Sequence, residues 1–240
     1  MNATSSSSSL GIVIFAFNER ENVRPVLEEL SRWLDQHEPN SEIIFVDDGS
    51  QDDTLAVARQ VLLESGKSRR AVCLRHETNR GIGAALKTGV AACGADWVTF
   101  LPADGQIEPA AIATLRDAAA PGDVDAVFSI YDDRNDGLDR KLLSFGVRAL
   151  ITLIHGVRVR SDGPYLFRRA LFDPEQLKPD TFFLNFEFPI RMRAAGLPTR
   201  TVPIRCRPRR SGFSKSTGLK RVLGVGRDLL ALRVRRARGL

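Results

Sequence analysis

The stretch EIIFVDDGS, residues 42–50, joins a short apolar run to two aspartates and a Gly-Ser pair. A run this short and rich in β-branched residues is typical of a strand buried on both faces of a parallel sheet, and the polar residues mark its end. Two other runs share this pattern: LGIVIFAF, residues 10–17, ends in Asn18-Glu19, and WVTFL, residues 97–101, ends in Pro102-Ala103-Asp104-Gly105. We therefore expect three strands that end in polar or acidic side chains.

Segments with helical periodicity alternate with the strands. The predicted strands are residues 10–17, 42–46, 71–74, 97–101, 125–130, 165–167 and 201–204. The predicted helices are residues 21–37, 54–64, 81–93, 109–119, 141–155 and 186–195. This alternation predicts an α/β fold with a mostly parallel sheet and right-handed crossovers. Ligands of such sheets bind beyond the carboxyl ends of the strands, where the polar clusters stand.

The charge of the chain is unevenly distributed. Of its 240 residues 43% are apolar, which fits one large folded domain, and the net charge is +6. Residues 197–240 hold 13 Lys and Arg but one acid, Asp228. A basic end on an acidic body indicates an anionic partner surface, and both membrane and nucleic acid qualify. The sequence has no run of 18 apolar residues, so it predicts no membrane-spanning helix.

Three parts are predicted along the chain. Residues 1–9 contain five consecutive serines and no basic residue, so we expect a disordered lead-in. Residues 10–216 form the predicted folded domain. Residues 217–240 predict a basic amphipathic helix that either lies in an anionic interface or packs on the domain. Its apolar stripe would be Leu219, Val222, Leu223, Leu229 and Leu230.

The histidines and cysteines form no recognisable metal-binding or nucleophilic pattern. His37, His76 and His155 lie far apart without ligand spacing, so we expect them to be structural or exposed. The three cysteines lack a C-x-x-C pair, which favours reduced thiols in a cytosolic protein. Ser-His-Asp hydrolysis has no support, because no G-x-S-x-G elbow occurs.

Three motifs together resemble those of the family 2 glycosyltransferases. They are AFNE at residues 16–19, VDDGSQDDT at residues 46–54 and GIGAALKTG at residues 81–89. The resemblance is strongest to the dolichol-phosphate mannosyltransferase-like, or polyprenyl-phosphate glycosyltransferase, branch, and it extends from about residue 11 to residue 215. It implies a GT-A fold, with a Rossmann-like sheet flanked by helices, and a nucleoside-diphosphate sugar as donor.

The strand-end carboxylates suit a nucleotide. Asp47 and Asp48 can accept hydrogen bonds from a base edge and ribose hydroxyls, but they repel a diphosphate unless a cation intervenes. The resemblance implies that Ala16, Glu19, Asp47 and Asp48 bind the nucleotide, and that Arg80 faces the same site.

The glycines of GIGAALKTG are a weak dinucleotide signal. The segment lacks the full G-x-G-x-x-G and a correctly spaced acid. For Gly83 and Gly89 we favour a structural role, in which a helix packs closely on the sheet.

The resemblance also implies a Mg²⁺ or Mn²⁺ site. The family's D-x-D motif reads Pro102-Ala103-Asp104, so its first carboxylate is absent. Asp104 and Gln106 match the remaining metal contacts of the family. Because Mg²⁺ often binds through one carboxylate plus substrate phosphates, we expect metal dependence with poor affinity when no nucleotide is bound.

A candidate acceptor-phosphate site follows the fifth strand. Residues 139–144 match the family segment that contacts this phosphate, with Arg140 and Ser144 one helical turn apart on the same face. Arg134, in the preceding loop, is a third candidate. The alternative for Arg140 is a solvated surface pair with a neighbouring aspartate.

The run RPRRSGFSK, residues 207–215, fits the closing pattern of the family. By resemblance, Arg209 and Lys215 clamp the donor and acceptor phosphates and offset the charge of the leaving group. A nucleic-acid patch is disfavoured, because aromatic interleaving and a known binding module are missing. The predicted catalytic residues are Asp104, Arg140, Arg209 and Lys215.

Two further carboxylates have open roles. Glu187, at the start of a predicted helix, orients an arginine, caps its helix or contacts the acceptor. Glu187 and Asp162 are also the candidate bases if the acceptor is a hydroxyl group.

The expected function is inverting transfer of one sugar, mannose or glucose, from a GDP- or UDP-linked donor to a dolichyl- or undecaprenyl-type phosphate. A phosphate monoester has a second pKa of roughly 6, so it is already a nucleophile and needs no strong base. Such an enzyme would be cytoplasmic and peripheral at the cytoplasmic face of the membrane. The alternatives are a hydroxyl acceptor, or a catalytically weak nucleotide-sugar-binding scaffold at the membrane.

Overall fold

The computed structural model describes residues 8–65, 69–132, 138–208 and 219–238. Within the two helices that begin at residues 138 and 219, it describes side chains only from residues 146 and 225 onward. The strands are β1 (Leu10–Ala16), β2 (Glu42–Asp47), β3 (Ala71–Arg75), β4 (Trp97–Pro102), β5 (Ala126–Tyr131), β6 (Leu166–Arg168) and β7 (Thr199–Ile204). The helices are α1 (Arg20–His37), α2 (Thr54–Glu64), α3 (Ile82–Ala92), α4 (Ala110–Ala119), α5 (Leu138–His155), the 3₁₀ turn η1 (Arg169–Leu171), α6 (Leu184–Ala194) and α7 (Leu219–Ala237).

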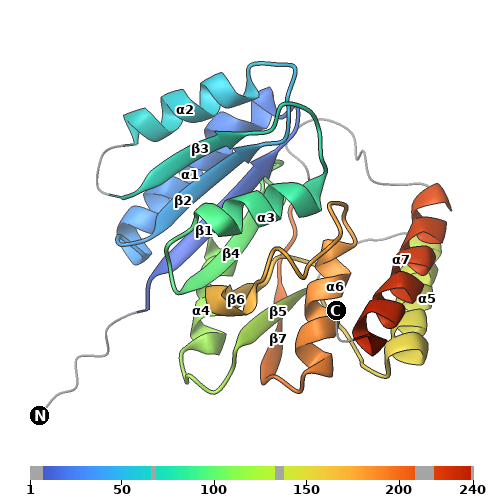
Figure 1. Cartoon of the computed structure of the whole chain (residues 1–240). Helices are drawn as coiled ribbons and strands as arrows, with labels where there is room; N and C mark the ends of the chain where they lie inside the picture. Colours follow the sequence, from blue (N-terminus) through green and yellow to red (C-terminus); the bar gives the residue numbers. More distant parts are fainter. Residues whose placement is uncertain (1–7, 66–68, 133–137, 209–218, 239–240) are drawn as a thin grey trace, which may run out of the picture.

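Seven strands of the described chain form one sheet in the order β3-β2-β1-β4-β6-β5-β7 (Figure 1). β1 pairs in parallel with β2 and β4, β3 with β2, and β7 with β5. The short β6 is antiparallel to both of its neighbours. The predicted mostly parallel α/β sheet is therefore confirmed. Its antiparallel member was not predicted, because a strand buried on both faces has the same apolar pattern in either direction.

Helices cover both faces of the sheet, and β1 shows why its sequence is apolar throughout. Ile12 and Ile14 face one core, which α1, α2 and α4 complete. Val13 faces the other core, which α3 and α6 complete. Gly89 of α3 lacks the Cβ that would collide with the Val13 side chain, so the predicted close packing of this helix on the sheet is confirmed at Gly89.

A third core lies where α5, α6 and α7 meet. Ile151 of α5, Phe183 and Ile190 near and within α6, and Leu229 and Leu232 of α7 are buried together. Figure 1 places α5 and α7 beyond α6, at one end of the molecule. The described part of α7 thus packs on the domain, which was one of the two alternatives for the basic helix.

The apolar stripe predicted for the basic helix is wrong at one position. Leu229 is fully buried, but the neighbouring Leu230 is 59% exposed. Consecutive residues point about 100° apart on a helix, so the two cannot share the packed face. Among the described residues, no helix has the length and apolar character needed to cross a membrane.

The end of the predicted lead-in is also structured. Ser9 donates hydrogen bonds to Asp96 through its backbone N–H, at 3.1 Å, and through its hydroxyl, at 3.0 Å. The carbonyl of Ser8 accepts one from Arg116, at 3.0 Å. The expectation of disorder is therefore wrong for Ser8 and Ser9.

Candidate active site

The carboxyl ends of β2, β1 and β4 bring three of the predicted site residues to one edge of the sheet. Ala16 is level with Asp47, and Phe15 is level with Pro102, two residues before Asp104. Backbone hydrogen bonds continue the register past the strand ends, from Asp48 N to Ala16 O, at 2.8 Å, and from Ala103 N to Phe15 O, at 3.1 Å. The register therefore brings the polar strand ends together, as the sequence predicts.

The loops after β1 and β2 are tied together. Asn18 has a φ of 52°, which asparagine tolerates better than most residues. In this conformation its Oδ1 accepts a hydrogen bond from Gln51 N, at 2.8 Å, while its own N–H donates to Ser50 Oγ, at 2.9 Å. One residue on, Glu19 N donates to Thr54 Oγ1, at 2.9 Å. These hydrogen bonds hold the two loops together beside the strand ends.

Glu19 lies at the start of α1. Its carbonyl accepts hydrogen bonds from the backbone N–H groups of Asn22, at 2.8 Å, and Val23, at 3.0 Å. Its carboxylate accepts one from Asn22 Nδ2, at 2.6 Å. Glu19 therefore orders the first turn of the helix and keeps a carboxylate next to the loops after β1 and β2.

Asp47 is a buried carboxylate at the end of β2. None of its surface is exposed. Its Oδ1 accepts a hydrogen bond from Ser50 N, at 3.2 Å, and its Oδ2 lies 3.4 Å from Arg75 Nε without hydrogen-bond geometry. The Arg75 side chain is 53% exposed, and its Nη2 donates a hydrogen bond to Ser50 O, at 3.0 Å, so the guanidinium lies over Asp47 at the surface.

Asp48 uses both of its carboxylate oxygens to hold the chain before α3. Oδ1 accepts a hydrogen bond from Arg80 N, at 2.9 Å, and Oδ2 accepts one from Gly81 N, at 2.8 Å. Oδ1 is also 2.7 Å from His76 Nδ1, and His76 Nε2 is 2.9 Å from Thr88 Oγ1. In this structure Asp48 therefore positions the loop that carries Arg80. His76 is structural, as the sequence predicted.

The loop before α6 closes against the first turn of α3. Ala84 N donates to Asp180 O, at 3.1 Å, and Lys87 Nζ lies 2.5 Å from Asp180 Oδ1. A Cβ at Gly81 or Gly83 would lie 2.6 Å from a carbonyl oxygen of this loop. The prediction that Gly83 allows packing on the sheet is thus wrong, because Gly83 makes room for residues 179–181. Arg80 stands beside this contact, 3.9 Å from Asp180.

Asp104 and Gln106 lie in the turn after β4. Asp104 is 5% exposed, and its Oδ1 accepts a hydrogen bond from Gln106 N, at 3.1 Å. The Gln106 carbonyl accepts one from Arg207 N, at 2.8 Å, and Arg207 also pairs with Glu29, at 2.8 Å, and with Glu108. The segment after β7 is thereby fastened over the Asp104 turn.

The donor set fits a divalent cation only in part. No cluster of three or more metal-binding side chains occurs among the described residues. One buried carboxylate, Asp104, beside a diphosphate would supply oxygen ligands of the kind that Mg²⁺ accepts. The described residues therefore fit a cation that is bound together with a diphosphate.

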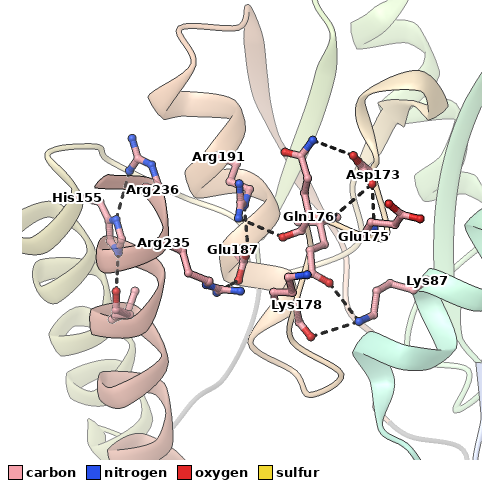
Figure 2. A network of polar contacts seen from close by, with 12 residues as sticks. Lys87, His155, Asp173, Glu175, Gln176, Lys178, Glu187, Arg191, Arg235 and Arg236 are labelled. Atoms are coloured by element: carbon pink, nitrogen blue, oxygen red, sulfur yellow. Dashed lines mark hydrogen bonds and ion pairs between the residues drawn. The ribbon is translucent and has the colours of Figure 1, made fainter. Parts of the chain in front are cut away.

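Glu187 is a buried hub between two helices. Its side chain has no exposed surface, and its two oxygens accept hydrogen bonds from Arg191 Nε, at 2.9 Å, and from Arg235 Nη2 of α7, at 2.6 Å (Figure 2). Arg191 in turn donates to Gln176 O, at 3.1 Å, and Lys87 donates to the carbonyls of the next two residues. Of the three roles open to Glu187, the geometry is that of orienting arginines.

Of the other predicted acceptor residues, the structure describes the side chain of Asp162 alone. Asp162 Oδ1 lies 3.4 Å from Arg148 Nη1 of α5, and Asp162 N donates to Ser129 O of β5, at 2.9 Å. Arg134, Arg209 and Lys215 lie outside the described residues, as do the side chains of Arg140 and Ser144 on α5.

A cavity of about 350 Å³ lies apart from this edge. It is lined by Leu171 after β6, by the last turn of α6 and by Arg236 of α7. Its lining also includes Gln176 and Leu177 of the loop before α6, and Leu177 O accepts a hydrogen bond from Lys87 of α3, at 3.1 Å. It contains none of the predicted site residues.

Sequence reasoning gave no role in the site to four residues that shape it: Arg75, His76, Asp180 and Arg207. Each acts on a predicted residue from a distant part of the chain, such as Arg75 on Asp47. Periodicity identifies helices and strands but not the contacts between residues far apart in the chain, so no local signal predicted the contacts of these residues. The acid at position 180 next to the glycine-rich start of α3 is recognisable only when the fold is known.

The fold and this edge define a class. A parallel sheet with acidic strand ends, flanked by helices, is the architecture of a nucleotide-binding α/β protein. The chain belongs to a particular family within that class, Glycosyl transferase family 2, whose model matches residues 11–185.

Two curated relatives are named for polyprenyl phosphates. Dodecaprenyl-phosphate galacturonate synthase of Rhizobium johnstonii is 30% identical over 65% of this chain and 46% of that protein. Undecaprenyl-phosphate 4-deoxy-4-formamido-L-arabinose transferase of Pseudomonas fluorescens is 32% identical over 68% of this chain and 48% of that protein. The names match the branch that the motifs resemble. The chain spans about half the length of these relatives.

The fold is GT-A-like. Glucosyl-3-phosphoglycerate synthase of Mycobacterium tuberculosis, solved with Mn²⁺, UDP-glucose and phosphoglyceric acid, superimposes with a TM-score of 0.70. The match covers 96% of this chain and 80% of that one, at 22% sequence identity. This likeness shows the shared fold.

Proposed function

We propose that the protein transfers one sugar from a nucleoside-diphosphate sugar to a polyprenyl phosphate, with inversion at the anomeric carbon. Family membership and the names of the relatives support the reaction class. The donor sugar differs between those relatives, so a mannose- or glucose-specific enzyme of the dolichyl-phosphate type is one version of this proposal.

The observation that carries the proposal is the incomplete hydrogen bonding of the buried Asp47 carboxylate. A buried carboxylate oxygen that accepts no hydrogen bond from the described residues is costly unless a ligand supplies a donor. An N–H group on the edge of a nucleotide base is such a donor. Displacement of the exposed Arg75 side chain would open the way to it.

The remaining donor contacts follow from the strand ends. Ala16 lies level with Asp47 at the end of β1, and Glu19 keeps its carboxylate at the start of α1, next to the loops after β1 and β2. Asp48 acts by holding the loop of Arg80. Asp104, with Gln106 beside it, would hold a Mg²⁺ or Mn²⁺ ion that neutralises charge on the diphosphate.

The proposed reaction needs no strong general base. A lipid phosphate oxygen attacks the anomeric carbon, the bond from that carbon to the diphosphate breaks, and the nucleoside diphosphate leaves with the electron pair. Cations must align two anions, and we assign this task to Arg140, Arg209 and Lys215, with Ser144 and Arg134 on the acceptor phosphate.

A hydroxyl acceptor is less well supported. It requires a carboxylate base within hydrogen-bond reach of the hydroxyl. Glu187 is buried and held by two arginines, and Asp162 is paired with Arg148. A phosphate acceptor avoids this requirement.

The lipid acceptor implies that the enzyme works at a membrane. We propose that it is cytoplasmic and peripheral, attached to the cytoplasmic face. Its basic C-terminal part supplies the attraction to anionic lipid.

The test is a transfer assay with labelled GDP- and UDP-sugars, Mg²⁺ or Mn²⁺, and three acceptor conditions: undecaprenyl phosphate, a soluble glycan and none. We expect one donor to label the organic extract only when the lipid phosphate is present. Label in the glycan would establish the hydroxyl alternative. Donor binding without product in any condition would establish the scaffold.

A further inference from the structure

The cavity beside α6 has the size of a small-molecule site. Its volume of about 350 Å³ lies within the range of roughly 300–1,000 Å³ that is usual for ligand pockets. Three parts of the chain that are far apart in the sequence enclose it: the segment between η1 and α6, the C-terminal half of α6, and α7. The proposed transfer reaction gives this cavity no role, because none of the described site residues lines it.

One wall of the cavity is apolar and firmly packed. Leu177, Phe188 and Met192 line it, although each is at most 3% exposed. The centroid of the Phe188 ring lies 5.0 Å from that of Phe167 and 5.3 Å from that of Phe172. These side chains cannot move into the cavity without losing packing in the core beneath them. The apolar wall is therefore preformed.

Two of the charged side chains that line the cavity already have partners. The carboxylate of Asp173 accepts hydrogen bonds from Glu175 N, at 2.9 Å, and from the side-chain amide of Gln176, at 2.8 Å. Arg191 donates to a carboxylate oxygen of Glu187, at 2.9 Å, and to the Gln176 carbonyl, at 3.1 Å (Figure 2). Both groups are therefore held by the protein itself.

Arg236 differs, because it has no carboxylate partner in the described part of the chain. Its Nη1 donates a hydrogen bond to Nδ1 of the His155 ring, at 3.2 Å. Burial, followed by the like charges of Arg233 and Arg191, lowers the pKa of Arg236 below its ordinary value. The surroundings of this guanidinium are thus positive, and an anion bound in the cavity would offset the repulsion.

A single negative charge would balance the groups around the cavity. Five ionic side chains line it or pair with a lining residue or with that residue's partner: Arg191, Arg235, Arg236, Asp173 and Glu187. Three positive and two negative charges leave one positive charge over, and Arg236 carries it. A planar guanidinium can donate two parallel hydrogen bonds to a carboxylate, which is a stronger arrangement than one bond to an imidazole ring.

We propose that this cavity is a binding site for a small monocarboxylate with an apolar body. The carboxylate pairs with Arg236, and the apolar body lies against the wall of Leu177, Phe188 and Met192. A dianion such as a phosphate monoester brings more charge than the cavity balances, and a neutral molecule leaves Arg236 unpaired. Because the lining joins α7 to α6, the ligand stabilises the packing of α7 on the domain.

The test uses octanoate as the probe and octanamide, which has the same chain length without the charge, as its matched control. Titration calorimetry with the full chain should detect octanoate. Octanamide should bind at least about tenfold more weakly, because a hydrogen bond between charged groups contributes more than one to a neutral group. Octanoate should also raise the urea midpoint, since it binds the folded chain.

Two variants address the two halves of the site. Arg236→Gln removes the charge, and Ala194→Leu places a larger side chain in the lining, so each should weaken octanoate binding at least about tenfold. Arg238→Gln is the control, since Arg238 is exposed on the same helix and outside the lining, and it should bind octanoate as wild type does. The urea midpoint without octanoate shows whether each variant is folded.

The comparison of octanoate with octanamide needs no variant, and equal affinities in wild type would overturn the assignment. Absence of octanoate binding to wild type would overturn it as well. Unchanged binding by folded Arg236→Gln or Ala194→Leu would place octanoate elsewhere, and an equal loss in Arg238→Gln would mean general attraction to a basic helix. Either result contradicts the site. No nucleotide or sugar enters the assay, so its result is independent of the proposed transfer.

Discussion

Asp47 is the buried carboxylate at which we expect the nucleotide to bind. A carboxylate without exposed surface needs compensating partners, and in the described chain its Oδ2 has the guanidinium of Arg75 at 3.4 Å without a hydrogen bond. The partner that completes it is the nucleotide in our account. The neighbouring Asp48 already has its partners in the loop before α3, so two adjacent aspartates have different tasks.

Asp47→Asn should therefore weaken nucleotide binding. Loss of one charge-assisted hydrogen bond costs about 1.5–3 kcal/mol, which corresponds to roughly 10- to 150-fold in affinity. Titration calorimetry with UDP and GDP measures it. Asp53→Asn, six residues on and 68% exposed, is the control and should change little. Equal affinities of wild type and Asp47→Asn would remove Asp47 from the donor site.

Asp104→Ala should abolish transfer and the part of nucleotide binding that depends on Mg²⁺ or Mn²⁺. Asp104 is the remaining carboxylate of the D-x-D signature, and the site has no cluster of ligands in the described chain to replace it. Binding with metal and with a chelator is compared in both proteins. A mutant that turns over like wild type in the presence of metal rules out this role.

His155 should make the packing of α7 sensitive to acid. Burial, together with Arg236 and Arg233 of α7, lowers its pKa below the ordinary 6.5. As a neutral ring it donates from Nε2 to Leu229 O, at 3.1 Å, and accepts at Nδ1 from Arg236 Nη1, at 3.2 Å. The unfolded chain then binds the proton more readily, so this stability is complete above pH 6.5 and is lost as the pH falls toward the lowered pKa.

The check is the urea midpoint at pH 7.5 and at pH 5.5. Wild type should lose more stability between the two values than His155→Gln, which cannot titrate. If both proteins lose the same amount, His155 does not control this packing. His37 and His76 are present in both proteins and cancel in the comparison.

At the scale of elements, the link between α6 and α7 rests on Glu187. Arg235→Met leaves this buried carboxylate paired with Arg191 but not with α7, and we expect a loss of about 3–5 kcal/mol in the free energy of unfolding. The control is Arg238→Met on the same helix, which is exposed and should cost less than about 0.5 kcal/mol. Denaturant unfolding measures both.

A second variant keeps this prediction decisive if Arg235→Met does not fold. Glu187→Gln/Arg235→Met removes the charge together with its partner, so it should be more stable than Arg235→Met alone. A double variant that is no more stable than the single one would mean that the pair does not hold α7.

Elements could be predicted where the sequence pattern is local. The runs before Asn18, Asp47 and Pro102 became β1, β2 and β4, and their ends came together as a parallel sheet requires. The partners of site residues could not be predicted, because Asp180 and Arg235 act across long separations in the chain. The direction of β6 and the outward turn of Leu230 also depend on packing, which periodicity does not encode.

At the scale of the whole molecule, we propose that donor and acceptor meet at the carboxyl edge of the sheet. The predicted donor residues lie at that edge, α5 follows β5, and α7 packs against α5.

The measurement that tests this most directly is the stoichiometry of transfer. Wild type is incubated with a labelled donor, a divalent metal and vesicles that contain undecaprenyl phosphate, and free nucleoside diphosphate and labelled lipid are quantified together. We expect one labelled lipid for each nucleoside diphosphate released, and neither product with Asp104→Ala. Nucleoside diphosphate released without labelled lipid, or donor bound with neither product formed, would contradict it.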